Sequence, residues 1–330
     1  MTSPVPSRRS VIGGALGVAG IAACGGPTKA AQAKNPAATT PGASRAATST
    51  PSPSSTSSTT SAPPPPLELP GGGRTIFPAN RLFGWCGAPN APALGQLGIG
   101  NLDTEMDKMI KVAPRWGDGR SVLPVAELIA TVVQGSPGRD GMYRVRMDDS
   151  VIDTWLKAAR KRKALLILNI QPGRARFIDE AKAYEKWLVE PDVGLALDPE
   201  WAIGPGQIPG RVFGHTTGAV VDSVANYLSG LVEKHRLPEK ALVVHVLRPD
   251  ILRAPAGLKA HDGVAMVKSV DGIGGAAAKT GTYERVMKGT PEFFRPGFKL
   301  FFSEDAKAGP LMTPKQVLAL RPQPDYVLYE

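Results

Sequence analysis

From Leu67 onward, short apolar runs alternate with stretches that have helical spacing. A near-continuous apolar run of four to eight residues is typical of a strand buried on both faces. Strands are predicted at Leu82–Ala88, Pro124–Val133, Ala164–Ile170, Val193–Leu197, Ala241–Leu247, Gly263–Val270, Phe298–Phe302 and Asp325–Tyr329. Helices are predicted at Thr104–Trp116, Asp149–Lys161, Asp179–Val189, Ala219–His235, Thr280–Met287 and Thr313–Leu320, where apolar residues recur every three or four positions.

Strands that alternate with helices over a domain of about 250 residues are typical of a (β/α)8 TIM-like barrel. The alternative is an open, doubly wound α/β sheet. No G-x-G-x-x-G follows the first strand, so we expect neither a dinucleotide site nor any other cofactor. We therefore predict one barrel domain over residues 67–330, with its functional residues at the carboxyl ends of the strands.

Residues 1–24 have the pattern of an export signal. Arg8 and Arg9 precede a Gly/Ala-rich apolar run that is too short to span a membrane, and paired arginines at this place indicate twin-arginine export. The run ends in Ile21-Ala22-Ala23-Cys24, which resembles a bacterial lipobox. That resemblance implies lipidation of Cys24 and anchoring to the outer face of the cytoplasmic membrane; the alternative is an ordinary secretory signal in which Cys24 has no role.

Residues 25–66 are almost entirely Ser, Thr, Pro, Ala and Gly, with no carboxylate. A segment of this composition cannot bury enough apolar surface to offset its ordering entropy, so we expect a disordered tether between the anchor and the barrel.

The formal net charge is +10, and five of the positive charges lie before Leu67. The predicted barrel is therefore mildly basic, which suits an anionic cell envelope. Basic and aromatic residues are not interleaved as they are in nucleic-acid modules, so we expect no nucleic-acid partner. With Cys24 lipidated, Cys86 is the remaining thiol, and we expect no intramolecular disulfide.

Polar residues gather where the predicted strands end. Three acidic groups follow the fourth, sixth and seventh strands, and carboxylates from separate strands that meet over one barrel mouth are what glycoside hydrolysis requires. The candidate catalytic residues are Glu200, Asp198 and Glu304. The candidate substrate-binding residues are Trp201, Trp85, Gln171, Asn169, His245, Asp271 and Tyr329.

Several of these residues also have structural interpretations. His245 lies inside an apolar strand and suits a hydrogen-bonded core position, and Glu127 falls mid-strand, where a buried carboxylate needs an ion-pair partner. Trp85 and Trp201 could serve core packing, and Glu304 could be a solvent-facing loop charge beside Asp305. With four histidines and no H-x-H or H-x-E spacing, no metal site is expected.

The stretch Val193–Trp201, V-G-L-A-L-D-P-E-W, together with G-P-G-Q-I-P-G after it and the segment Leu311–Leu318, resembles a group of actinobacterial exported lipoproteins with glycosidase-like barrels. It also partly resembles the chitinase-type D-x-D-x-E motif of strand four. That resemblance implies that Glu200 is the general acid and that Asp198 assists the substrate. Ala196 stands where the motif has its first Asp, and Pro199 stands where retaining barrel glycosidases have Asn.

These patterns lead to two hypotheses. The first is a cell-surface lipoprotein whose barrel acts on or binds an envelope polysaccharide, with Glu200 as general acid. The second is a non-catalytic envelope-binding or assembly lipoprotein, which the departures at Ala196 and Pro199 favour.

Overall fold

The computed structural model describes residues 65–330. The predicted signal peptide, the lipidation site at Cys24 and residues 25–64 of the predicted tether lie outside the described residues. The described part carries no helix that is both long and apolar enough to cross a membrane.

Eight parallel strands form a closed barrel, because β1 pairs with β2 on one side and with β11 on the other. Their order around the barrel is the order of the chain, with each strand beside the next. The strands are β1 (Asn80–Gly87), β2 (Ser121–Val133), β4 (Leu165–Ile170), β5 (Val193–Leu197), β7 (Lys240–Val246), β9 (Val264–Val270), β10 (Phe294–Leu300) and β11 (Tyr326–Tyr329). The predicted (β/α)8 barrel is confirmed, and the open sheet is excluded.

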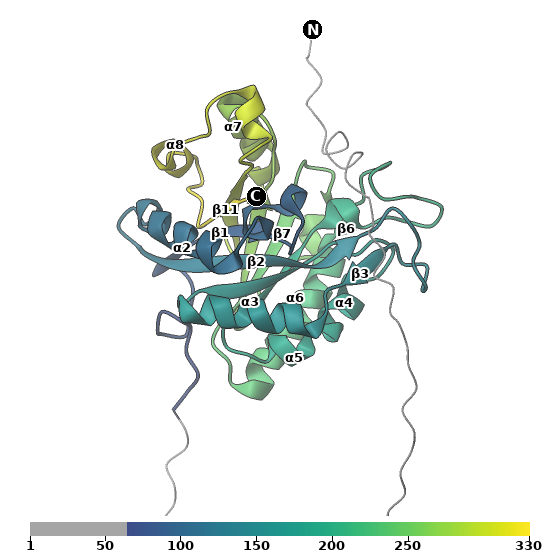
Figure 1. The fold of residues 1–330 in the computed structure, drawn as a ribbon, viewed down its shortest axis with the longest axis horizontal. Helices are drawn as coiled ribbons and strands as arrows, with labels where there is room; N and C mark the ends of the chain where they lie inside the picture. The colour runs from purple at the N-terminus through teal and green to yellow at the C-terminus, as the bar shows by residue number, and fades with distance from the viewer. Residues whose placement is uncertain (1–64) are drawn as a thin grey trace, which may run out of the picture. The chain divides into compact units, whose positions relative to one another are not determined.

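Helices follow most strands and pack on the outside of the barrel. They are α2 (Leu102–Val112), α3 (Asp149–Lys161), α4 (Phe177–Ala183), α5 (Glu185–Leu188), α6 (Gly218–His235), α7 (Ala276–Met287) and α8 (Pro314–Leu318). In Figure 1, α7 and α8 lie on one side of the barrel and α3 to α6 on the other. No α-helix connects β7 to β9; this crossover carries the short strand β8 (Leu252–Arg253) and the 3₁₀ turn Pro255–Gly257.

Two further strand pairings lie outside the barrel. β3 (Arg144–Arg146) forms an antiparallel hairpin with the end of β2, and β6 (Thr216–Thr217) pairs with β8. The second pairing joins the loop after β5 to the loop after β7. Both pairings therefore build up the loops at the carboxyl ends of the strands.

Side chains alternate between two apolar clusters along each strand, as the period of two requires. Phe83 and Trp85 of β1 pack in the larger cluster with Met106 and Met109 of α2, so these residues point outward. The smaller cluster contains strand residues from around the barrel and fills its interior: Leu82, Cys86, Leu123, Val125, Leu165, Ile167, Ala196, Ala241, Val243, Ala265, Val267, Tyr326 and Leu328.

The segment that precedes β1 closes the amino-end face of the barrel. Leu69 and Ile76 are buried and belong to the interior cluster. The backbone N–H of Ile76 donates to Glu239 Oε2 at 2.6 Å, and Arg74 donates to the carbonyl of Leu237 at 2.8 Å. The chain thus enters the barrel from the face opposite the carboxyl ends of the strands.

Candidate active site

The motif after β5 folds into a single buried turn. β5 ends at Leu197, and Pro199–Trp201 forms a 3₁₀ turn with proline at its first position, where no N–H is needed. The N–H of Asp198 donates to the carbonyl of Ile170 at 3.0 Å, and the N–H of Trp201 donates to the carbonyl of Asp198 at 3.2 Å. Asp198 and Glu200 are each 1% exposed and Trp201 is 7% exposed. The two carboxylates and the indole are therefore held together at the mouth of the barrel.

Asp198 and Trp201 each carry a buried polar atom that has no hydrogen-bond partner among the described residues. Asp198 Oδ2 accepts a hydrogen bond from Gln171 Nε2 at 3.3 Å, but Asp198 Oδ1 accepts none, and Trp201 Nε1 donates none. A buried polar group without a partner costs free energy, of the order of 1–3 kcal/mol. A hydroxyl group can donate to a carboxylate and accept from an indole N–H. The turn thus offers an acceptor and a donor that suit polyhydroxylated ligands.

Neighbouring loops fix this turn through their backbones. Ala202 forms an isolated bridge with Gly173 in the loop after β4, and the N–H of Ile203 donates to the Gly173 carbonyl at 2.9 Å. The N–H of Gly214 donates to the carbonyl of Glu200 at 2.6 Å. A Cβ at Gly214 would lie 2.1 Å from the carbonyl oxygen of Ala202, so this close approach requires glycine.

Below the mouth, a polar network crosses the interior of the barrel. His245 on β7 has Nε2 at 3.0 Å from Glu127 Oε1 of β2 and Nδ1 at 2.9 Å from Asp271 Oδ2, just after β9. Glu127 also accepts from Asn169 Nδ2 at 2.9 Å and from the Tyr326 hydroxyl at 2.8 Å. Asp271 accepts a further hydrogen bond from the Ser269 hydroxyl at 3.0 Å.

The charges of this network support one another. Burial alone would lower the pKa of His245, but the carboxylates of Asp271 and Glu127 outweigh it and raise this pKa well above 6.5. Burial would raise the pKa of Glu127, yet His245 and Lys299 hold it below its usual value. Desolvation and the neighbouring Glu127 raise the pKa of Tyr326 well above 10, so the tyrosine stays a hydrogen-bond donor. His245 is therefore an imidazolium between two carboxylates.

The network continues to the last strands of the barrel through Lys299. Its Nζ lies 2.7 Å from Glu330 Oε2 and 3.4 Å from Asp271 Oδ2. Lys299 and Asp271 are almost completely buried, whereas the Glu330 side chain is 11% exposed. The Cys86 thiol lies 3.8 Å from Glu330 Oε2. Glu330 therefore lies at the upper, more accessible edge of the network.

The structure brings together most of the predicted site residues, but it separates two aromatic ones. Asp198, Gln171, Asn169, His245 and Asp271 join the mouth or the network beneath it. Trp85 and Tyr329, in contrast, pack in the outer layer: Phe302 meets the Trp85 ring edge-on at 5.4 Å and stacks on Tyr329 at 4.7 Å. This placement does not favour the predicted substrate contact for these two residues.

Glu304 lies farther from the barrel than the sequence indicates. β10 ends at Leu300 rather than Phe302, so Glu304 belongs to a turn beyond the strand and is half-buried. The next residue, Asp305, is buried and forms an ion pair with Lys279 at 2.8 Å. Its carboxylate also accepts from the N–H groups of Gly274 and Phe301, which closes the turn. Of the two neighbouring carboxylates, Asp305 therefore has a structural role.

Sequence reasoning identified part of the interior network. The ion pair expected for Glu127 is confirmed, and so is the buried, hydrogen-bonded environment of His245. The sequence pattern does not indicate the roles of Lys299, Glu330 and Tyr326. The available signal was Lys299 itself, a lysine in the apolar run Phe298–Phe302, because a buried cation needs a partner.

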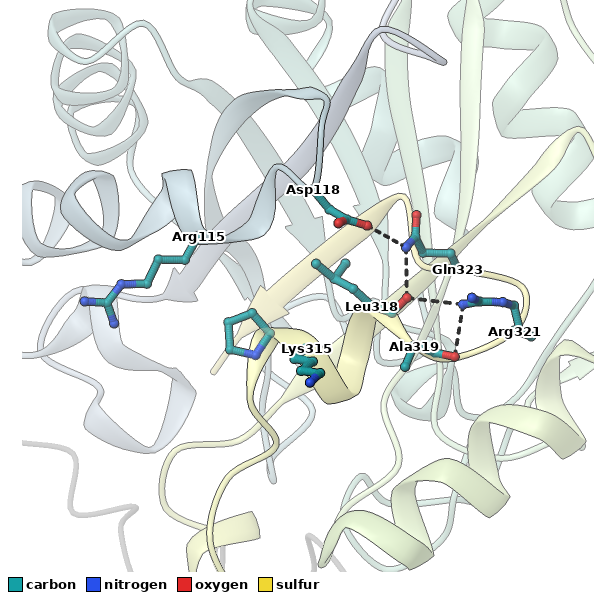
Figure 2. A pocket seen from close by; sticks show the side chains of 8 residues that line it. Arg115, Asp118, Lys315, Leu318, Ala319, Arg321 and Gln323 are labelled. Carbon is teal, nitrogen blue, oxygen red and sulfur yellow. Dashed lines mark hydrogen bonds between the residues drawn. The ribbon is translucent and has the colours of Figure 1, made fainter.

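Two surface hollows lie at the opposite, amino-end face of the barrel. Their volumes are about 520 and 500 Å³. Figure 2 shows the first, where Gln323 Nε2 donates to Asp118 and to the carbonyl of Leu318, and Arg321 donates to the carbonyls of Leu318 and Ala319. Several of the polar groups that line it are thus already bonded to the protein. In barrels of this fold, residues at the amino-end face usually contribute to stability rather than to ligand binding.

Among residues 65–330, no cluster of three or more His, Cys, Asp or Glu side chains has an arrangement suited to a metal ion. In the comparisons with known proteins, no family model matches the chain and no curated protein is found as a relative.

Proposed function

We propose that this chain is an exported lipoprotein, anchored through Cys24, whose barrel binds an envelope polysaccharide and hydrolyses it with Glu200 as the general acid. The observation that carries the proposal is the buried turn of Asp198, Glu200 and Trp201 at the mouth of the barrel. Its unpartnered carboxylate oxygen and indole N–H match the donors and acceptors of a sugar hydroxyl.

The charge around the mouth supports an anionic polysaccharide. We call five arginines on four neighbouring loops, those after β2, β4, β5 and β7, the arginine rim: Arg139, Arg174, Arg211, Arg248 and Arg253. Arg176, at the end of the β4 loop, pairs with Asp179 and is not included. These loops also carry carboxylates besides the buried Asp198 and Glu200: Asp140 pairs with Arg144, Asp250 pairs with Arg248, and Asp148 and Asp262 lie just before α3 and β9. Such a rim attracts polymers that bear carboxylate or phosphate groups.

Two rim arginines contact the loop that follows the turn. The Arg174 guanidinium lies 4.3 Å from the centre of the Tyr143 ring, and its Nη2 donates to the carbonyl of Gln207 at 2.9 Å. Arg248 lies 4.7 Å from the centre of the Phe213 ring. Arg174 directly follows Gly173, which bridges to Ala202 beside Trp201. A polymer bound at the turn would therefore pass these arginines.

Binding tests the first part of the proposal. The purified chain from residue 67 onward, or the full chain, would be titrated with neutral and acidic envelope polysaccharides. Trp201→Phe removes the indole N–H but keeps a ring, and we expect it to weaken binding about tenfold, the loss of one or two hydrogen bonds. Trp85→Phe is the matched control, because it also removes a buried, unpartnered N–H but in the outer layer. Equal effects of the two variants would contradict the proposed site.

Turnover tests the second part. Glu200→Gln should abolish release of sugar fragments while the melting temperature and the binding affinity remain close to those of the wild type. Turnover that survives in this variant would exclude Glu200 as the acid. The competing function is a non-catalytic envelope-binding or assembly lipoprotein, which Ala196 and Pro199 favour. Tight binding by the wild type with no fragment release would establish that alternative.

A further inference from the structure

The strand order places two carboxylate sites on opposite walls of the barrel mouth. β5, which leads into Asp198 and Glu200, is the fourth strand of the barrel, and β11, which leads into Glu330, is the eighth. In a closed barrel of eight strands, the fourth and the eighth face each other across the axis. Glu330 therefore lies opposite the turn that carries the proposed acid.

The side chain of Glu330 points into the barrel. Tyr326 and Leu328 belong to the interior cluster, whereas Val327 and Tyr329 belong to the outer one, so residue 330 continues the inward series. The contacts of Glu330 support this direction, because Lys299 and Cys86, which it contacts, are also interior residues. The backbone holds this direction, since the N–H of Glu330 donates to the carbonyl of Leu300 at 2.9 Å.

Lys299 gives Glu330 the charge state that a second catalytic carboxylate requires. A carboxylate 2.7 Å from an almost completely buried ammonium group is held in its ionised form. Asp271 also faces Lys299, but His245 and Ser269 already bind it and it is completely buried. Within this network, Glu330 combines an ionised carboxylate with access to the mouth.

We propose that Glu330, rather than Glu304, is the second catalytic carboxylate of this barrel; this inference rests on the hydrolytic function proposed for Glu200. Glu200 gives its proton to the glycosidic oxygen, and the bond between that oxygen and the anomeric carbon breaks with its electron pair on the leaving oxygen. Glu330 either attacks the anomeric carbon or accepts a proton from the water that attacks it. Water supplies the hydroxyl group of the product, and no redox partner is needed.

The experiment compares three variants of the full chain on the polysaccharide that the wild type binds best. Glu330→Gln removes the negative charge and keeps the shape. Glu330→Asp keeps the negative charge and can still pair with Lys299. Its side chain is shorter by one methylene group, so the carboxylate lies farther from the mouth. Glu304→Gln is the matched control at the neighbouring strand end. For each, binding is measured by calorimetry, fragment release by reducing-end assay, and folding by the melting temperature.

We expect Glu330→Gln and Glu330→Asp to lower fragment release by about 10²–10⁴-fold, the contribution typical of a positioned acid or base. Their binding should stay within a few fold of the wild type, and Glu304→Gln should release fragments at the wild-type rate. A purely structural role for Glu330 would lower the melting temperature and leave the rate of the folded Glu330→Asp variant nearly unchanged, which would overturn the inference.

The remaining outcomes separate this inference from the proposed function. Loss of fragment release in Glu304→Gln, with Glu330→Gln active, would overturn the role of Glu330 and leave the role of Glu200 intact. Binding by the wild type without any fragment release would overturn the catalytic role of Glu330 and leave a binding lipoprotein. Neither binding nor release by the wild type would overturn both proposals.

Discussion

His245 Nε2 and Glu127 Oε1 lie 3.0 Å apart although their strands, β7 and β2, are not neighbours in the barrel. The contact crosses the interior, and Asp271 holds the other ring nitrogen at 2.9 Å. In many barrels of this fold the same space is filled by layers of apolar side chains. Here a charged network fills the upper interior, which makes the stability of the fold dependent on pH.

The first prediction concerns that dependence. The pKa of His245 is raised on folding, so its contribution to stability is fully present below the unfolded pKa of about 6.5 and is lost as the pH rises through the folded value. Above pH 6.5 we expect His245 to lower the free energy of unfolding by about 1.4 kcal/mol per pH unit. Urea denaturation of the wild type and of His245→Gln from pH 6 to pH 9 measures this slope.

The contribution of His245 is the difference between the pH slopes of the two proteins. Buried lysines change the free energy of unfolding with pH in the opposite direction, and this difference removes their effect. Burial lowers the pKa of Lys240 to about 7 and that of Lys268 to about 8. A base with a lowered folded pKa binds fewer protons when folded, so its effect on stability becomes more favourable as the pH rises. Both lysines remain in His245→Gln. Parallel curves for the two proteins would show that His245 is not charged in the folded state.

The second prediction concerns the hairpin of β2 and β3. Glu180 on α4 is completely buried and accepts hydrogen bonds from Arg144 Nε at 2.9 Å and from Arg146 Nε at 2.8 Å. Glu180→Gln leaves Arg146 without its anion and Arg144 with Asp140 alone, and we expect a loss of about 1–3 kcal/mol in the free energy of unfolding. Asp179→Asn, next to it, breaks an exposed pair with Arg176 and should cost less than about 1 kcal/mol. Similar losses for the two variants, measured by urea denaturation, would show that Glu180 does not hold β3 on α4.

The third prediction concerns Gly173, which links the β4 loop to the proposed site. Its φ is +59°, and a Cβ there would lie 2.2 Å from the carbonyl oxygen of Met142. Gly173→Ala should therefore shift both the hairpin and Ala202, so that binding weakens together with stability. Gly206→Ala is the control, since Gly206 also has a positive φ but has open space around its Cβ position. Ligand titration and thermal melting of both variants measure the two effects, and unchanged binding in Gly173→Ala would show that this loop does not position the turn.

The fourth prediction concerns the arginine rim. Arg139 and Arg253 are exposed, and their replacement by alanine should weaken binding of an acidic polysaccharide several fold at low salt. The effect should shrink as ionic strength rises, because salt screens exposed charges over about 8–10 Å. Arg115→Ala, an exposed arginine on the amino-end face, should leave binding unchanged. Calorimetry at two salt concentrations tests this, and equal effects of rim and control arginines would indicate nonspecific attraction.

The apolar runs were sufficient to predict the barrel, because strands buried on both faces carry the strongest sequence signal. The bounds of β5 and α3 agree with the prediction residue for residue. β10 begins earlier, at Phe294, because Pro296 is accommodated inside the strand, where its carbonyl still accepts from the N–H of Asp325 at 2.8 Å. The predicted helix Asp179–Val189 is instead two helices that meet at Tyr184.

The site was harder to predict, because a shift of one residue along a strand exchanges the inward and outward faces. Tyr329 ends the last strand and Glu330 follows it, and the apolar pattern does not tell which of the two faces the interior. Of the partners of His245, Asp271 follows the neighbouring strand β9, whereas Glu127 lies on β2, which the interior of the closed barrel brings opposite β7. The turn after β5 was predictable because its residues are consecutive.

The way in which the chain enters the barrel has a consequence for its orientation at the cell surface. Leu69 and Ile76, in the segment before β1, cover the amino-end face of the barrel. With Cys24 lipidated as we propose, the attachment point is the underside of the barrel, and the mouth with Trp201 opens on the side away from it. A polymer could then enter the mouth without passing the point at which the tether is attached.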